Sequence, residues 1–269
     1  MKRAIAWLTA VLLVVLLSSC GPGGAEVVNL DGSTAMSGVM AALGEAYRER
    51  MPGARINCSG SGSGAGIEGV LSGTCGIGLS SRELTAEEMA RGAVGRVLAL
   101  DGVAVIVHPD NPVRDLSRQT LAALFTGELD CWTQAGGGDR PVAVYGREAG
   151  SGTRTAFEEA LGITDRCAYR NECCSTGDVV GGVASNPNAV GYVSLSALND
   201  TVAALAVDGV PCTLETVRTG TYPIRRPLLL VTGGEGDPGG AAGAFWRFAL
   251  SREAEPYLAA AGAAVPEGA

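Results

Sequence analysis

The sequence predicts an α/β fold built on a mainly parallel sheet. The spacing of apolar residues switches repeatedly between the period of strands, about two residues, and that of helices, about 3.6 residues. The predicted strands and helices alternate along the chain, an order that favours parallel strands covered by helices. The chain has 269 residues, of which 46% are hydrophobic and 18% charged, so it can bury the core of one large domain or of two lobes.

The first part of the chain contains three predicted strand–helix units. Each strand is short and apolar, and each is followed by a turn rich in Gly, Ser or Thr. The third helix begins with Thr85-Ala-Glu-Glu88, which has the spelling of a capping box. The expected strands cover residues 27–30, 54–58 and 76–79, and the expected helices contain residues 36–47 and 67–71 and start near residue 85.

A second group of units begins with Val103-Ala-Val-Ile-Val107, a β-branched strand that prolines stop soon after its end. The later expected elements are helices over residues 118–125, 151–161 and 245–250 and strands over residues 142–145, 189–193 and 228–231. We expect two lobes joined by two crossings, near residues 107–111 and 218–227. Lobe 1 then comprises residues 27–107 and 223–269, and lobe 2 comprises residues 108–222.

The N-terminus has the features of an export signal. Two basic residues precede an apolar run, residues 4–17, that is shorter than the roughly 20 residues needed to span a bilayer. The run ends in Leu17-Ser-Ser-Cys20, the lipobox pattern of bacterial lipoproteins, in which the cysteine is acylated. We therefore expect residues 1–20 to be a lipoprotein signal peptide, Cys20 to carry the lipid anchor, and residues 21–26 to form a tether.

Charge and cysteine content restrict the function classes further. The formal net charge of −8 argues against nucleic acid or anionic lipid as a partner, so an anionic ligand must be held by local groups. His108 is the single histidine and no Cys-x-x-Cys spacing occurs, which argues against a metal site. Cysteines in an exported chain usually form disulfides, and Cys58 with Cys75 is the first pair that we expect. Seven cysteines follow Cys20: Cys58, Cys75, Cys131, Cys167, Cys173, Cys174 and Cys212.

Four turns share one design, in which a strand ends, Ser, Thr and Gly follow, and a helix starts. The first N–H groups of a helix have no internal partner and lie at the positive end of its dipole, so an oxyanion can bind there. Parallel strands bring such turns to one edge of the sheet, although Ser and Thr are also ordinary helix caps where nothing binds. The turns are Gly32-Ser33-Thr34, Gly62-Ser63-Gly64-Ala65-Gly66, Ser80-Ser81-Arg82 and Gly150-Ser151-Gly152-Thr153.

Two arginines flank the last of these turns. Arg147 and Arg154 are both candidates for an anion, whereas a surface ion pair with Glu158, four residues on, is the alternative for Arg154. The nucleotide P-loop pattern and the G-x-S-x-G pattern of serine hydrolases are absent. A match to G-x-G-x-x-G at residues 64–69 lacks the acidic residue that a dinucleotide site requires.

Taken together, the motifs resemble the phosphate-binding lipoproteins of bacterial phosphate ABC transporters. The resemblance runs from about Val27 to about Pro266, with the motifs in the family's order. They are Asp31-Gly-Ser-Thr34, Gly62-Ser-Gly-Ala-Gly66, Ser80-Ser-Arg82, Asp101-Gly-Val-Ala-Val-Ile-Val107, Arg147 with Gly150-Ser-Gly-Thr-Arg154, and Asn186-Pro-Asn-Ala-Val-Gly-Tyr192.

The resemblance implies a periplasmic-binding-protein fold of class II. Two lobes, each a mainly parallel sheet flanked by helices, would close on one phosphate and deliver it to the permease subunits in the membrane. No catalytic residue and no cofactor is implied. The expected phosphate-binding residues are Ser33, Thr34, Ala35, Ser63, Ser81, Arg82, Arg147, Ser151, Gly152 and Thr153.

One departure from the family pattern concerns ligand selectivity. The family often has aspartates at the positions of Ser81 and Gly76, and the first of these accepts a proton from phosphate and so rejects sulfate. Another acidic residue, Asp31, Glu83 or Asp178, would have to replace it. A binding protein for another tetrahedral oxyanion, such as sulfate, is therefore an alternative. A phosphate sensor and a secreted phosphatase-like enzyme are further alternatives on other grounds.

Overall fold

The computed structural model describes residues 27–266 and has the α/β architecture that the sequence predicts. One nine-stranded sheet runs through the molecule in the order β2-β1-β3-β11-β4-β8-β6-β7, with β9 beside β4, and β5 and β10 form a separate two-stranded sheet. The strands are β1 (Val27–Gly32), β2 (Arg55–Ser59), β3 (Ile77–Ser80), β4 (Val94–Val107), β5 (Asp115–Leu116), β6 (Ala143–Arg147), β7 (Asn171–Cys173), β8 (Ala189–Ser194), β9 (Ala203–Ala204), β10 (Ala206–Val207) and β11 (Arg225–Thr232).

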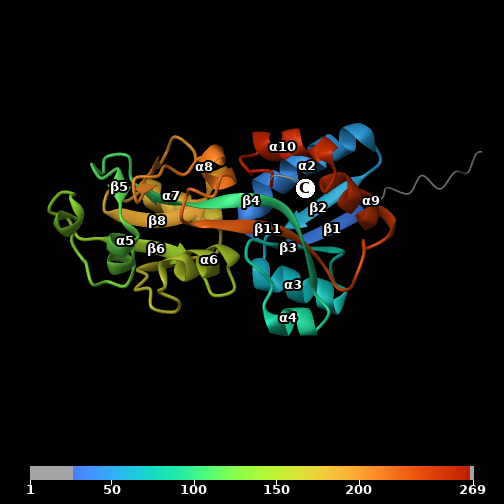
Figure 1. Ribbon diagram of the computed structural model, residues 1–269, viewed down its shortest axis with the longest axis horizontal. Helices are drawn as coiled ribbons and strands as arrows, with labels where there is room; N and C mark the ends of the chain where they lie inside the picture. Colours follow the sequence, from blue (N-terminus) through green and yellow to red (C-terminus); the bar gives the residue numbers. More distant parts are fainter. Residues whose placement is uncertain (1–26, 267–269) are drawn as a thin grey trace, which may run out of the picture.

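Helices cover both faces of the sheet in each lobe (Figure 1). The α-helices are α2 (Ser37–Arg50), α3 (Ser63–Ser72), α4 (Ala86–Ala90), α5 (Arg118–Phe125), α6 (Gly152–Leu161), α7 (Thr176–Ala184), α8 (Leu214–Arg218), α9 (Gly240–Ala249) and α10 (Glu255–Ala260). Short 3₁₀ turns are η2 (Thr34–Met36), η3 (Trp132–Ala135), η4 (Leu195–Ala197) and η5 (Arg252–Ala254).

Two long strands join the lobes. Within lobe 1, β1 pairs in parallel with β2 and β3, and within lobe 2, β6 pairs in parallel with β7 and β8. Between them, β4 and β11 are antiparallel to each other, and each runs from one lobe toward the other (Figure 1). Since β4 pairs with β11 up to Gly102 and with β8 from Val103, we propose a lobe boundary at this point rather than near residue 107.

Most of the expected elements are confirmed, with ends that differ by a few residues. The predicted inner face of α2 is buried as expected, from Val39 to Tyr47, and the capping box of Thr85 and Glu88 forms at the start of α4. The first part of β4 and the whole of α7 were not expected. In β4 the apolar pattern is interrupted by Arg96, and α7 contains several glycines, which lower helix propensity.

Each lobe has its own core. In lobe 1, α2 and α9 pack on the sheet, and the Tyr47 ring lies edge-on against Phe245 with centroids 5.4 Å apart. In lobe 2, Phe157 stacks on Tyr192 at 4.1 Å, beside Phe125. These cores hold the strand ends, and hence the turns, in place.

The expected disulfide between Cys58 and Cys75 is wrong. All seven cysteines of the described chain are free thiols. β1 lies between β2, which carries Cys58, and β3, which Cys75 precedes. Strands on either side of a third are about 9–10 Å apart, whereas a disulfide needs Cα atoms within about 7 Å. Burial raises the pKa of the Cys58 thiol to about 11.

Three of the expectations concern residues outside those that the structure describes: the signal peptide over 1–20, the acylated Cys20 and the tether over 21–26. In the part from 27 to 266, no helix combines the length and the apolar character needed to cross a bilayer. The same part holds no group of three His, Cys, Asp or Glu side chains placed to bind a metal ion.

Candidate functional site

The turns after β1, β2 and β3 meet at one edge of the sheet, as parallel strands require. Ser33 donates a hydrogen bond to Ser81 Oγ at 2.7 Å, and Ser63 Oγ lies 3.4 Å from the same atom. The backbone N–H of Ser81 donates to Ser63 Oγ at 3.1 Å. All three serines are buried. Three turns from distant parts of the sequence thus form one cluster of hydroxyl groups.

Glycine makes this close approach possible. A Cβ on Gly66, in the first turn of α3, would lie 2.4 Å from the carbonyl oxygen of Asp31. A Cβ on Gly32, where φ is +140°, would lie 2.2 Å from the carbonyl oxygen of Leu79. Any larger residue would push α3 and β3 away from the end of β1. The glycines therefore set the spacing of the serines.

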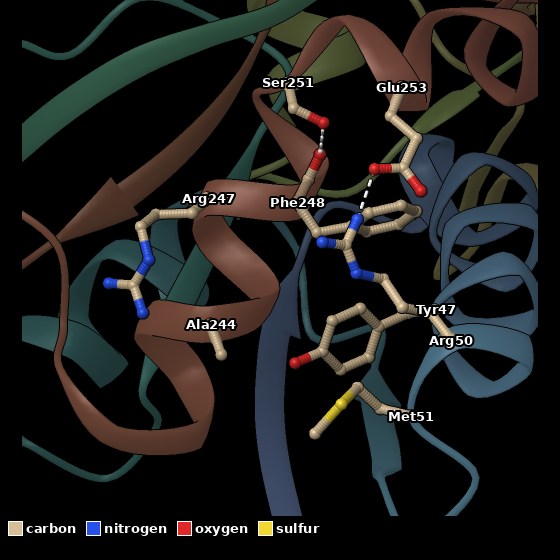
Figure 2. Close-up of a pocket in the computed structure, with 8 residues that line it drawn as sticks. All are labelled: Tyr47, Arg50, Met51, Ala244, Arg247, Phe248, Ser251 and Glu253. Carbon is tan, nitrogen blue, oxygen red and sulfur yellow. Dashed lines mark hydrogen bonds and ion pairs between the residues drawn. The ribbon is translucent and has the colours of Figure 1, made fainter.

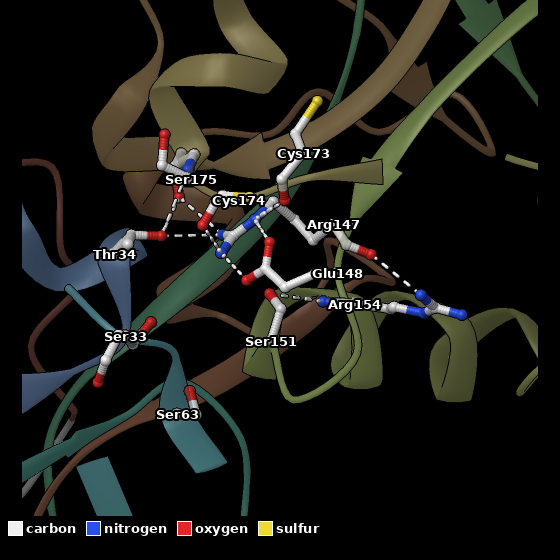
Figure 3. Close-up of polar contacts among 12 residues, drawn as sticks. Ser33, Thr34, Ser63, Arg147, Glu148, Ser151, Arg154, Cys173, Cys174 and Ser175 are labelled. Atoms are coloured by element: carbon white, nitrogen blue, oxygen red, sulfur yellow. Dashed lines mark hydrogen bonds and ion pairs between the residues drawn. The ribbon is translucent and has the colours of Figure 1, made fainter. Parts of the chain in front are cut away.

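Lobe 2 contributes Arg147, which ends β6 and is only 2% exposed. Its Nη1 donates to Thr34 Oγ1 of lobe 1 at 2.9 Å, and its Nη2 donates to Glu148 Oε1 at 2.6 Å (Figure 3). Backbone carbonyls of Cys173 and Cys174 accept from Nε and Nη2, each at 3.0 Å. A guanidinium held at this many points presents a fixed positive charge to the space between the lobes.

The two lobes are in contact around the cluster. Besides the Arg147–Thr34 bond, the N–H of Gly64 donates to the carbonyl of Gly150 at 3.1 Å. Gly152, the first residue of α6, lies so close to lobe 1 that a Cβ there would be 2.4 Å from Ser63 Oγ. The structure is therefore a closed form, in which the start of α6 faces the serine cluster.

Thr153, the second residue of α6, carries a buried hydroxyl without a partner. Among the described residues, its Oγ1 is the one buried side-chain nitrogen or oxygen that makes no hydrogen bond, and the residue is 1% exposed. Such a group costs about 1–3 kcal/mol. An oxygen-rich ligand at the start of α6 would satisfy it together with the free N–H groups of the helix.

Comparisons with known proteins agree with this geometry. The family model described as the PBP superfamily domain matches residues 21–253. The chain belongs to the PBP superfamily.

Several relatives within this superfamily have similar sequences. The phosphate-binding protein PstS of Bacillus subtilis is 35% identical over 210 residues, which cover 73% of this chain and 67% of that protein. PstS of Borreliella burgdorferi is 27% identical over 245 residues, covering 86% of this chain and 88% of the relative.

Solved structures extend the likeness to the fold. A Clostridium perfringens protein described as a phosphate ABC transporter substrate-binding protein, solved with bound phosphate, is 35% identical with a TM-score of 0.84. The alignment covers 90% of this chain and all of that one. An ABC-type phosphate transport receptor from Vibrio cholerae is 30% identical with a TM-score of 0.72, over 89% of this chain and 100% of the other. The two-lobed architecture of this PBP-superfamily chain is thus shared with phosphate-binding proteins.

The structure brings nearly all the expected site residues of the PBP-superfamily chain together. Ser151 is the N-cap of α6, where its Oγ accepts from the N–H of Arg154 at 3.5 Å. Ala35 is buried beside Thr34, and its carbonyl accepts a hydrogen bond from Ser196 of lobe 2. The residues gathered around the cluster are Ser33, Thr34, Ala35, Ser63, Ser81, Arg147, Ser151, Gly152 and Thr153.

Two arginines from the same turns have other partners. Arg82 binds both carboxylate oxygens of Glu88, at 2.6 and 2.9 Å, and this side-chain contact lowers the pKa of Glu88. Arg154 pairs with Glu158 at 2.9 Å and lies over the Tyr169 ring, 4.9 Å from its centroid. The structure therefore does not bring Arg82 to the cluster, and Arg154 makes the ion pair that the sequence offered as its alternative.

Sequence reasoning missed a second buried arginine. Arg226, on β11, donates from Nε and Nη2 to Asp101 Oδ2 on β4, at 2.9 and 2.8 Å. Its Nη1 donates to Ser81 Oγ at 3.2 Å. The two side chains form a buried ion pair at 2.8 Å, and burial raises the pKa of Asp101 while the guanidinium opposes that change. Charged residues within otherwise apolar strands were the available signal.

Thr176, at the start of α7, was also missed. Its Oγ1 accepts from Arg147 Nη1 at 3.3 Å, and its N–H donates to Thr34 Oγ1 at 3.3 Å. The helix that carries it could not be read from the sequence, so its cap could not be placed either.

A cavity of about 370 Å³ lies elsewhere on lobe 1, between α2 and α9 (Figure 2). Its two arginines are paired, Arg50 with Glu253 and Arg247 with Asp237. None of the clustered serines lines this cavity. The polar cluster between the lobes, and not this hollow, is the candidate site.

Proposed function

We propose that the protein captures inorganic phosphate between its two lobes and delivers it to the membrane permease of an ABC transporter. The observation that carries this proposal is the cluster of buried serine hydroxyls between the lobes, with Arg147 bound to the neighbouring Thr34 and Thr153 Oγ1 left without a partner at the start of α6. The names of the relatives, phosphate-binding proteins and phosphate transport receptors, support the same ligand.

The proposed ligand groups come from both lobes, so binding would couple to closure. Lobe 1 offers the hydroxyls of Thr34, Ser63 and Ser81, and lobe 2 offers Arg147 and the start of α6. Hydrogen bonds to charged groups contribute about 1.5–3 kcal/mol each, and a micromolar dissociation constant needs about 8 kcal/mol. A handful of such donors suffices even after the anion is desolvated. Arg82 would have to leave Glu88 to take part.

Phosphate is bound without chemical change in this proposal. A phosphatase-like enzyme needs a base beside a nucleophile. His108, the one histidine of the chain, follows the end of β4, where its Nδ1 accepts from the backbone N–H of Asp110 at 3.1 Å. That position supports binding over hydrolysis. Release of a chromogenic product from a generic phosphate ester would contradict it.

We also propose an extracytoplasmic location with a lipid anchor on Cys20. PstS-type relatives and the lipobox sequence support this, and residues 21–26 would serve as the tether. Metabolic labelling with a radiolabelled fatty acid tests the anchor, because Cys20→Ser would abolish the label while the protein is still made.

A thermal-shift series tests the ligand. The soluble chain from residue 21 onward is heated with phosphate, sulfate, molybdate and arsenate. A ligand that binds only the folded state raises the melting temperature with its concentration. Phosphate is expected to raise it, and no shift with phosphate at millimolar concentration would refute the proposed ligand.

A further inference from the structure

Ser81 lies at the point where the two strands that join the lobes meet the proposed phosphate site. Its hydroxyl is fully buried and touches three other side chains. Two of these contacts have a defined direction: Ser33 donates to Ser81 Oγ at 2.7 Å, and Arg226 Nη1 donates to it at 3.2 Å. A guanidinium has no acceptor, so the second direction cannot reverse.

A serine oxygen has two acceptor lone pairs. In Ser81 both are occupied, one by Ser33 and one by Arg226, so its own proton remains to be donated. Ser63 Oγ is the near acceptor in the protein, but at 3.4 Å it is at the long limit of an O–H···O hydrogen bond. The other neighbour is the start of α6, since a Cβ on Gly152 would lie 2.8 Å from Ser81 Oγ. The proton is thus free to point between the lobes.

Arg226 is itself held rigidly. Its Nε and Nη2 are fixed by Asp101, its Nη1 also donates to the Ser81 carbonyl at 3.3 Å, and both charged side chains are only 1% exposed. The planar guanidinium therefore cannot turn toward the ligand without leaving Asp101 unpaired in the interior, which is costly. The hydrogen bond by which Arg226 reaches the serine cluster is the one to Ser81 Oγ.

We propose that Arg226 is a positioning residue that fixes Ser81 as a hydrogen-bond donor to the bound anion. The inference rests on the proposed function, because it assigns a role within the same site. It also bears on selectivity: a donor serves any oxyanion, whereas an acceptor would recognise the proton of phosphate, which sulfate lacks. Near Ser81, the Asp101 carboxylate is paired with Arg226, so it is not left free to accept that proton.

Isothermal titration of phosphate into four proteins tests the coupling: wild type, Ser81→Ala, Arg226→Lys and the double variant. Lysine keeps the charge beside Asp101 but has a single nitrogen in place of the planar fork, which uses Nε and Nη2 for Asp101 and Nη1 for Ser81. Ser81→Ala is expected to weaken binding about ten- to a hundredfold. Arg226→Lys should weaken it several-fold in the wild type but by less than about twofold in the Ser81→Ala background. Equal losses in both backgrounds would overturn the positioning role.

Ser80→Ala is the matched control. Ser80 is equally buried and adjacent, but its hydroxyl donates to the Arg82 carbonyl at 2.8 Å and does not contact Arg226. Ser80→Ala should leave phosphate affinity within about twofold of the wild type. In a double variant, Arg226→Lys should weaken binding by the same factor as it does in the wild type.

Sulfate provides a second test that does not need a folded Arg226 variant. If Ser81 donates, the wild type binds sulfate at millimolar concentration and Ser81→Ala weakens sulfate and phosphate by the same factor. A loss confined to phosphate, or no binding of sulfate by the wild type, would overturn the inference while the proposed function stands. If phosphate itself fails to bind but sulfate follows the expected pattern, the proposed function fails and the role of Ser81 stands. If neither anion binds, both are refuted.

Discussion

At the scale of single residues, the site depends on which side chains are held by the protein and which are left to a ligand. The Arg147 side chain donates hydrogen bonds to five residues, including Thr34 across the lobes, whereas the Thr153 hydroxyl has no partner among the described residues. Arg154, in the same turn, is taken up by Glu158. Arg147, Thr153 and Arg154 thus lie within one short segment, but they differ in which partners their side chains already have in the protein.

Arg147→Ala and Arg154→Ala separate the two arginines. Arg147→Ala is expected to weaken phosphate binding by well over tenfold, because it removes the charge that faces the space between the lobes. Arg154→Ala should change it by less than about threefold, since that guanidinium contacts Glu158 and the Tyr169 ring and, within the described chain, makes no contact across the lobes. Titration calorimetry measures both, and equal losses would show that the arginines are misassigned.

Thr153→Val tests the unpartnered hydroxyl. Valine has nearly the same shape, and replacing a buried hydroxyl that makes no hydrogen bond is expected to raise the melting temperature of the unliganded protein slightly. The same change should weaken phosphate binding about tenfold. A stable variant that binds phosphate as well as the wild type would mean that Thr153 does not contact the ligand.

The sequence predicts the site residues that belong to turns and misses those that approach from elsewhere. Ser33, Ser63 and Ser151 follow from one pattern, a small polar residue between a strand and a helix. Arg226 reaches Ser81 only because β11 lies between β3 and β4, a sheet order that no local pattern shows. Contacts that depend on sheet order could not be read from the chain.

At the scale of elements, one residue of α4 stabilises both the start of that helix and the turn that precedes it. Glu88 closes the capping box with Thr85 and also binds Arg82 with both carboxylate oxygens. The hydrogen bond from Arg82 is the largest cause of the lowered pKa of Glu88. The turn after β3, which carries Ser81, is thereby tied to the helix that follows it.

This pair makes a pH-dependent contribution to stability. A carboxyl whose pKa is lowered by folding stabilises the folded state above its ordinary pKa, here 4.5, and that stability is lost as the pH falls through the lowered value. Glu88→Gln is therefore expected to lower the melting temperature at neutral pH, with a difference from the wild type that shrinks below pH 4.5. Glu87→Gln, which changes the exposed neighbouring residue, is the control. If the difference in melting temperature between Glu88→Gln and the wild type did not change with pH, the Arg82–Glu88 pair would not be the source of this stability.

Elements with strong periodicity were predictable, and those formed by tertiary context were not. α5 begins and ends where the sequence places it, at Arg118 and Phe125. α7, with Gly177, Gly181 and Gly182, is helical because Val179 and Val183 are buried against the sheet. Packing, and not propensity, stabilises such a helix.

At the scale of the whole molecule, β4 is the one strand of the described chain with partners in both lobes, and β11 begins at the same boundary, with Arg225 opposite Gly102. Closure therefore has to bend or twist the chain at this point. The Asp101–Arg226 pair lies where β4 changes partner from β11 to β8. Contacts such as Gly64 with Gly150 then form between the faces that close. The contacts between the lobes thus lie in the same turns as the proposed ligand groups.

Gly152→Ala tests whether binding needs this close contact. The added Cβ would lie 2.4 Å from Ser63 Oγ, so it should hold the lobes apart and weaken phosphate binding roughly tenfold or more. Small-angle X-ray scattering with saturating phosphate should show a larger radius of gyration than for the wild type. Gly64→Ala is the control, because its Cβ would meet Gly150 at an ordinary 3.6 Å. Unchanged affinity and shape in Gly152→Ala would mean that the lobes do not close on the ligand here.

A calorimetric titration of phosphate into the soluble chain, repeated with Arg147→Ala, tests whether the protein captures phosphate between its lobes. Capture between the lobes predicts one phosphate per chain, a dissociation constant of about a micromolar or below, and loss of that binding in the variant. Absence of binding at millimolar phosphate, or binding that survives in Arg147→Ala, would contradict the account.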